Sequence, residues 1–88
     1  MDPSPEVEIL LRRANTHYGA GEFAEAVDIL TEVIRIDPTV RKAWVSLATN
    51  HEELGNLEKA LKFKIVAAHL MSAKAAAREW ASLGTQSR

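Results

Sequence analysis

The chain contains no cysteine. Disulfide bonds and thiolate zinc sites are therefore excluded, and nothing in the sequence indicates that folding needs an oxidising compartment. At 88 residues the chain is one small domain or a section of something larger, so its single core can be only modestly stable.

An excess of either charge is also missing. The formal net charge of −1 and the pI of about 6.3 argue against a large basic surface for nucleic acid or anionic membrane. No apolar run could span a bilayer, and the start, MDPSPEVEIL, lacks the basic flank and apolar block of a signal peptide. We therefore expect a soluble intracellular protein without a membrane partner.

Glycine and proline are scarce, with four and three residues, while alanine, leucine and charged residues are plentiful. This composition favours helix throughout, and no segment alternates like a strand. We expect five helices joined by short connections, so that neighbours pack antiparallel. The first begins at Pro5 behind the cap Ser4, and the others begin near Phe23, near Val40, after Asn56 and near Ser72.

The sequence repeats itself with a period of 34 residues. The matching pairs are Ala14 and Ala48, His17 and His51, Gly21 and Gly55, and Ala26 and Ala60. This period, with the segments WVSLA at Trp44 and WASLG at Trp80, resembles the tetratricopeptide repeat (TPR), a helix-turn-helix unit. Gly21 and Gly55 would permit the tight, left-handed backbone that reverses the chain between paired helices.

The resemblance implies an all-α TPR helical solenoid. We expect two TPR helix hairpins and a C-terminal helix that caps the second or begins a third repeat. The whole chain, 1–88, would be a single TPR domain cut from a longer array, with repeat 1 over about 7–40, repeat 2 over about 41–76, and the cap or partial repeat over about 77–88.

The residues offer little chemistry. His17 and His51 occupy equivalent points of successive repeats, about 8 to 10 Å apart, which is too far to share a metal ion, and His69 lies on another helix. Glu52 and Glu53 are adjacent and point apart, so they form no acid/base pair. We therefore expect no enzyme activity, cofactor or metal, and nominate no catalytic residue. The basic residues are interleaved with acids, which leaves nucleic-acid binding as a weak alternative.

Protein binding is the function that remains. In TPR arrays the first helix of each pair lines a concave groove. The matching positions in this sequence are Glu8, Leu11, Asn15, Tyr18, Lys42, Val45, Thr49 and Glu52, of which all but Glu8 are our candidate binding residues. Whether these residues bind a partner or belong to a spacer repeat stays open at this point, because solenoids use only some repeats for binding.

A carboxylate clamp of the chaperone-binding kind is not expected. It would need cationic and amide side chains at positions occupied here by Leu11, Asn15, Ser46, Arg78 and Ser82. Only Asn15 matches outright and Arg78 conservatively, so most donors for a carboxylate are missing.

Three segments are more specific than the TPR consensus: EVIRIDP from Glu32, HEELGNLEKAL from His51, and KIVAAHL from Lys64. They resemble the TPR-containing subunits of general transcription factor IIIC, which serves RNA polymerase III. The resemblance implies a nuclear scaffold that recruits transcription factor IIIB and contacts other factor IIIC subunits. A generic cytoplasmic TPR adaptor that holds a peptide or helix in its groove is the alternative, and a designed consensus array is a third.

The helix that contains KFKIVAAHLM is apolar on two sides. One stripe holds Leu57, Leu61, Ile65 and Ala68, and the opposite one holds Ala60, Phe63, Val66, Ala67 and Leu70. We expect the residues after Ser72 to cover the second stripe, so that their deletion causes aggregation. Self-association through the open end of the repeats is left undecided.

Overall fold

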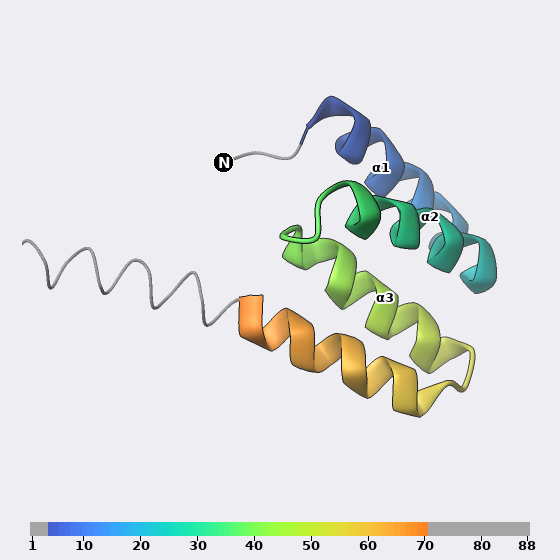
Figure 1. The fold of residues 1–88 in the computed structure, drawn as a ribbon. Helices are drawn as coiled ribbons and strands as arrows, with labels where there is room; N and C mark the ends of the chain where they lie inside the picture. Colours follow the sequence, from blue (N-terminus) through green and yellow to red (C-terminus); the bar gives the residue numbers. More distant parts are fainter. Residues whose placement is uncertain (1–3, 71–88) are drawn as a thin grey trace, which may run out of the picture.

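A computed structural model describes residues 4–70, and the statements below concern that range. It contains α1 (Pro5–Gly19), α2 (Phe23–Ile36), α3 (Arg41–Glu53) and a fourth helix over residues 57–70. The helices stack one after another, each turned back along the one before it (Figure 1). None of those found in residues 4–70 is long and apolar enough to cross a membrane.

Residues 4–70 hold four helices, not the five expected for the whole chain, and no strand. The fourth helix reaches residue 70. The predicted fifth helix, from near Ser72, lies outside the described residues, as does the expected cap or third repeat.

The ends of α1 follow from local chemistry. The Ser4 side chain accepts a hydrogen bond from the Val7 amide at 3.3 Å, and Pro5 occupies the first helical position, where its missing N–H costs nothing. Beyond the helix, Gly21 has φ +79°, the left-handed region that glycine adopts freely. The predicted cap and the predicted reversal are both confirmed.

The second helix pair ends in the same way. Gly55 has φ +82°, and the Asn56 amide donates to the His51 carbonyl at 2.8 Å, as the Glu22 amide does to the His17 carbonyl at 2.8 Å. The 34-residue period of the sequence is therefore also a period of the backbone.

The connection between α2 and α3 is fixed by its own side chains. Asp37 accepts hydrogen bonds from the Thr39 hydroxyl at 2.6 Å and the Thr39 amide at 3.0 Å, and these bonds lower the pKa of Asp37. The Trp44 indole donates to the Pro38 carbonyl at 2.8 Å. Together these contacts tie the first turn of α3 to the end of α2.

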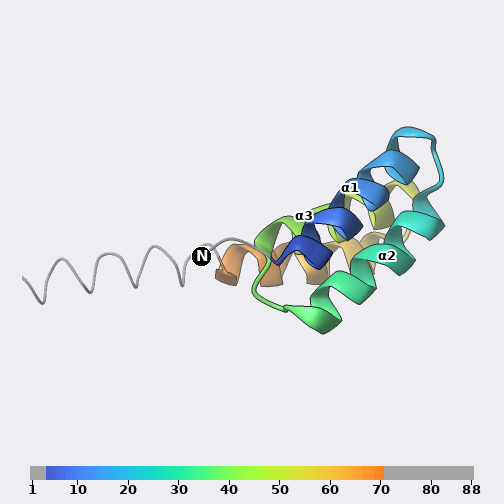
Figure 2. The ribbon, with the colours of Figure 1, turned by 90° about the horizontal axis from the view of Figure 1, so that it is seen from above.

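The core lies where α2 packs against both α1 and α3. Its buried members are Val7, Ala14, Ala26, Leu30, Val33, Ala43 and Leu47. Three of them are alanines, and their small side chains let the helix axes approach closely. Seen from above, α1 and α3 overlap in one layer while α2 lies to one side (Figure 2).

The fourth helix packs on α3 through Phe63, whose ring stacks on His51 at 5.3 Å and contacts Trp44 at 5.7 Å. Ala60 and Ala67 are buried beside it. The stripe that we expected the C-terminal residues to cover is therefore the one that faces α3, and that assignment was wrong. It failed because periodicity separates two apolar faces without saying which neighbour each one meets.

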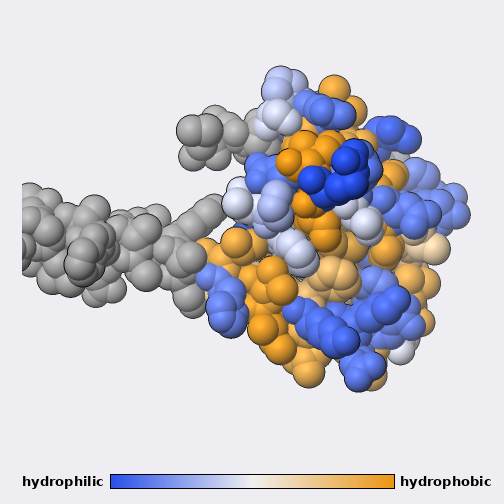
Figure 3. Space-filling model, in the orientation of Figure 1, coloured by the Kyte–Doolittle hydropathy of each residue, from blue (hydrophilic) through white to orange (hydrophobic). Residues whose placement is uncertain are grey.

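The other apolar face of this helix is open in the described structure. Leu57, Leu61 and Ile65 are 67%, 58% and 50% exposed. They recur every four residues and so form one line, which we call the open stripe. Figure 3 shows apolar surface over this part of the molecule, interrupted by hydrophilic side chains.

The left-handed turn at Gly55 generates a stability prediction. We expect Gly55→Ala to lower the free energy of unfolding by about 1 kcal/mol, because alanine is strained at φ +82°. Gly19 is the matched control, since an added Cβ meets nothing within 4 Å at either position and Gly19 ends a helix. Gly19→Ala should raise stability by roughly 0.5 kcal/mol. Urea unfolding measures both, and equal effects would contradict the backbone assignment.

Candidate functional site

A pocket of about 430 Å³ lies between α1 and α3, with α2 beneath it. α2 packs against one side of both α1 and α3. On the opposite side, the two helices leave a hollow between them. The residues that line the pocket are Glu8, Leu11, Arg12, Ala14, Asn15 and Tyr18 of α1, Leu30 of α2, and Lys42, Ser46, Thr49 and Asn50 of α3. Its volume is in the range of ordinary ligand sites.

Five of the seven predicted groove residues line this pocket: Leu11, Asn15, Tyr18, Lys42 and Thr49. On each helix they follow the spacing of one face, with Leu11, Asn15 and Tyr18 at i, i+4 and i+7. The sequence pattern therefore selected residues of two separate helices that line one pocket in the structure. Glu8, which the same pattern named, also lines the pocket.

The other two predicted residues do not line the pocket. Val45 is 38% exposed on α3. Glu52 accepts a hydrogen bond from the Lys64 ammonium at 2.5 Å, so its carboxylate is turned to the fourth helix. This contact follows from Lys64, which the sequence places where the repeat pattern has a bulky apolar residue.

The pocket is apolar and buried at its floor and polar at its rim. Leu30 and Ala14 are 1% and 3% exposed, and Leu11 and Tyr18 are half-buried above them. The Tyr18 ring is held against Phe23, with centroids 5.6 Å apart. Such a surface can bury an apolar group while polar atoms fix its orientation.

Three charged residues stand at the rim, namely Glu8, Arg12 and Lys42, and all are exposed. None of them belongs to the ion pairs found within residues 4–70, which are His17–Glu22, Glu32–Arg35 and Glu52–Lys64. Two cations against one anion leave the rim with a charge of +1.

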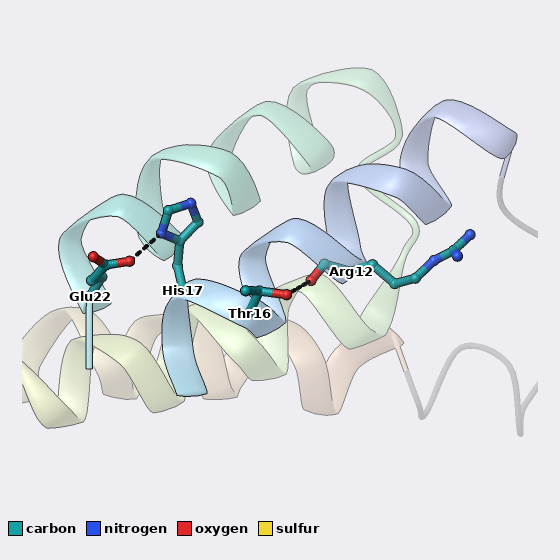
Figure 4. A network of polar contacts seen from close by, with 4 residues as sticks. All are labelled: Arg12, Thr16, His17 and Glu22. Carbon is teal, nitrogen blue, oxygen red and sulfur yellow. Dashed lines mark hydrogen bonds and ion pairs between the residues drawn. The ribbon is translucent and has the colours of Figure 1, made fainter. Parts of the chain in front are cut away.

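Arg12 contributes its main chain to α1 and its side chain to the rim. Its carbonyl accepts a hydrogen bond from the Thr16 hydroxyl at 3.1 Å, and its guanidinium points away from Thr16 and His17 (Figure 4). The guanidinium is therefore not engaged in the polar network at the end of α1.

The lining residues that were not among the predicted groove positions are Arg12, Ala14, Leu30, Ser46 and Asn50, and of these Asn50 is the one that is both polar and buried. It is 2% exposed, and its side-chain amide donates to the Ser46 carbonyl at 2.8 Å. Its Oδ1 atom is buried and accepts no hydrogen bond from the part of the chain that the structure describes. The available signal was position: Asn50 follows the buried Leu47 by three residues and so belongs to the inner face of α3.

The two repeat-equivalent histidines differ in surroundings. His17 Nδ1 lies 2.7 Å from a Glu22 carboxylate oxygen at the surface (Figure 4). His51 is only 6% exposed, and its Nδ1 lies 3.3 Å from Nδ2, the side-chain amide nitrogen of Asn56. Burial, and to a smaller extent the charge of Lys59, lowers the pKa of His51. These are the structural and surface roles expected from sequence.

His69 is exposed, as expected, with its Nδ1 3.2 Å from the Ile65 carbonyl oxygen. The described residues hold no group of three side chains that could bind a metal ion.

Comparison with known proteins gives a family and two relatives. The tetratricopeptide repeat model matches residues 17–83. The chain is 35% identical over 78 residues to General transcription factor 3C polypeptide 3 of Homo sapiens, covering 89% of this chain and 9% of that protein. It is 40% identical over 75 residues to Transcription factor tau subunit sfc4 of Schizosaccharomyces pombe, covering 80% and 8%. The predicted resemblance is confirmed, and the chain spans less than a tenth of either relative.

The buried His51 generates a pH prediction. Its folded-state pKa is depressed, so its contribution to stability is complete above its ordinary pKa of 6.5 and is lost as the pH falls through the folded-state value. We expect His51→Tyr to lose less unfolding free energy than the wild type between about pH 7.5 and pH 5.5. His17→Tyr, at the equivalent surface position, is the control. Urea unfolding at both pH values measures the losses, and an equal loss in wild type and His51→Tyr would contradict the assignment.

Proposed function

The chain belongs to the tetratricopeptide repeat family, and on that premise we propose that it is a non-catalytic scaffold whose pocket between α1 and α3 binds a segment of a partner protein. The observation that carries the proposal is the lining of the pocket. Groove positions from both repeats contribute to one hollow with an apolar floor and a polar rim. Such a surface suits a peptide or helix that presents both apolar and polar groups.

We further propose that the chain is part of the TPR array of transcription factor IIIC and recruits transcription factor IIIB for RNA polymerase III transcription in the nucleus. Two supports exist: the segments that resemble factor IIIC subunits, and the two relatives whose names are those of transcription factor components. The partners would be factor IIIB components and other factor IIIC subunits. No direct contact with nucleic acid is part of the proposal.

The division into repeats is also a proposal. The spacing of the described helix pairs supports a first repeat over about 7–40 and a second that begins at about 41. The end of the second repeat at about 76 and the cap or partial third repeat over about 77–88 rest on the sequence pattern. In this division the residues after 70 cover the open stripe of Leu57, Leu61 and Ile65, because three large apolar side chains in a line are costly to leave in water.

The groove proposal predicts the effect of filling the pocket. We expect Asn15→Trp to weaken binding to purified factor IIIB or factor IIIC subunits by about tenfold or more, because the indole would occupy the hollow. Asn15 is exposed, so the change should leave the core intact. Asp28→Trp on α2 is the matched control, since Asp28 is exposed and lies outside the pocket. Biolayer interferometry with the immobilised chain measures the affinities.

Two results would count against these proposals. Equal affinity of Asn15→Trp and wild type would remove the pocket as the binding surface. Failure of the wild-type chain to bind any factor IIIB or factor IIIC subunit would overturn the transcription assignment.

The repeat division predicts an effect of truncation. A chain that ends at Ser72 should self-associate through the open stripe, whereas the same truncation carrying Leu57→Lys and Leu61→Lys should be monomeric. Light scattering after size-exclusion chromatography gives the masses. A truncated chain that is monomeric and as stable as the full chain would refute the covering role.

A further inference from the structure

One face of α1 is left uncovered by the described residues. On α3 the equivalent face lies against α2, and its members are at most 2% exposed, namely Ala43, Leu47 and Asn50. On α1 the matching residues, 34 positions earlier, are all exposed, namely Ile9, Arg13 and Thr16. We call these three residues the outer face of α1. Its counterpart on α3 binds a helix, so the outer face has the position and the shape to bind one as well.

Arg13 changes the chemistry of this face. Its counterpart Leu47 is completely buried and shares the core with Leu30 of α2, which is 1% exposed. A helix that packed on the outer face through a leucine, as α2 does on α3, would remove water from the Arg13 guanidinium without giving it a partner. The outer face is therefore poorly suited to an apolar helix of the α2 kind.

The remaining residues of the face leave this cation as its main polar feature. Ile9 is 54% exposed and offers an apolar anchor. The Thr16 hydroxyl donates to the Arg12 carbonyl at 3.1 Å and so needs no partner (Figure 4). None of the ion pairs found within residues 4–70 includes Arg13. Glu6, an acid on the same side of α1, lies seven residues away, which is about 10 Å along the helix.

Charge also decides against a second copy of the chain as the occupant. Head-to-tail stacking would bring the fourth helix of one copy onto α1 of the next, and the counterpart of Leu30 in that helix is Lys64. Lys64 would then meet Arg13, and the Glu52 carboxylate that Lys64 already binds would have to serve both cations. Like charges at a contact cost free energy, so the outer face disfavours its own kind.

We propose that the outer face of α1 docks an amphipathic helix of a partner protein, which presents an Asp or Glu to Arg13 and an apolar side chain to Ile9. Arg13 sets the preference for an acidic helix, and Ile9 supplies the apolar contact. The surface is separate from the pocket, because none of its three residues lines the pocket. A partner can therefore occupy the outer face whether or not the pocket is filled.

The probe is a synthetic helix with the sequence of residues 22–37, because α2 is the helix that covers the equivalent face of α3. A hydrocarbon staple between positions 24 and 28, which are exposed on α2, keeps the peptide helical. One peptide retains Leu30, and three others carry Leu30→Glu, Leu30→Gln or Leu30→Lys. Each is titrated into the ¹⁵N-labelled full chain, and the main-chain amide shifts give the site and the affinity.

We expect the Leu30→Glu peptide to shift the amides of the outer face. It should bind about fivefold more tightly than the Leu30→Gln peptide, which is the upper range for an ion pair that stays partly exposed. Arg13→Glu in the chain should reverse the order, so that the Leu30→Lys peptide binds best. Lys62→Glu is the matched control, because Lys62 is exposed and lies on the fourth helix, and it should keep the wild-type order.

Four results would overturn the proposal. Binding of the Leu30 peptide as tightly as the Leu30→Glu peptide would make the outer face an ordinary apolar joint. Peptide shifts that fall on Leu11 and Thr49 and are lost in Asn15→Trp would support the groove and refute the outer face. Outer-face shifts on raising the concentration of the chain alone would make a second copy the occupant. The absence of outer-face shifts with every peptide would refute docking, and if Arg13→Glu does not fold, the order of the peptides on the wild type decides.

Discussion

The packing of α2 between α1 and α3 is the contact on which the rest of the structure depends. Leu30 is 1% exposed, belongs to the core and also lines the pocket, so the side chain that joins the helices is part of the pocket floor. Because α2 holds α1 and α3 on one side only, the opposite side stays open as a groove. The same contacts therefore stabilise the fold and shape the pocket that we propose as the binding surface, so a change in the core would alter the shape of that pocket.

The same arrangement explains why a polar residue is tolerated inside. Asn50 lies on the inner face of α3, where Leu47 and Ala43 are fully buried, and a leucine there would satisfy the core better. Natural proteins carry such departures where function requires them. The inner face of α3 therefore supplies both apolar contacts of the core and a buried polar residue that lines the pocket.

Much of this fold could be predicted from sequence because its determinants are local. Ser4, Gly21 and Gly55 act through their own backbone and nearest neighbours, and the 34-residue period carried the same turn to both repeats. The same period named seven groove positions, and five of them line the pocket. Glu52 does not, because its carboxylate meets Lys64 on another helix. The covered stripe could not be predicted, because it depends on which helix packs where. Asn50 escaped because a consensus pattern does not report an acceptor left without a donor.

The central claim is that the hollow between α1 and α3 is the surface that meets a partner protein, and nuclear magnetic resonance tests it most directly. A ¹⁵N-labelled sample of the chain would be titrated with a purified factor IIIB subunit. The account predicts that the largest shifts fall on the main-chain amides of Leu11 and Thr49 and on the side-chain amide of Asn50. Shifts confined to the open stripe, around Leu57, Leu61 and Ile65, would contradict it.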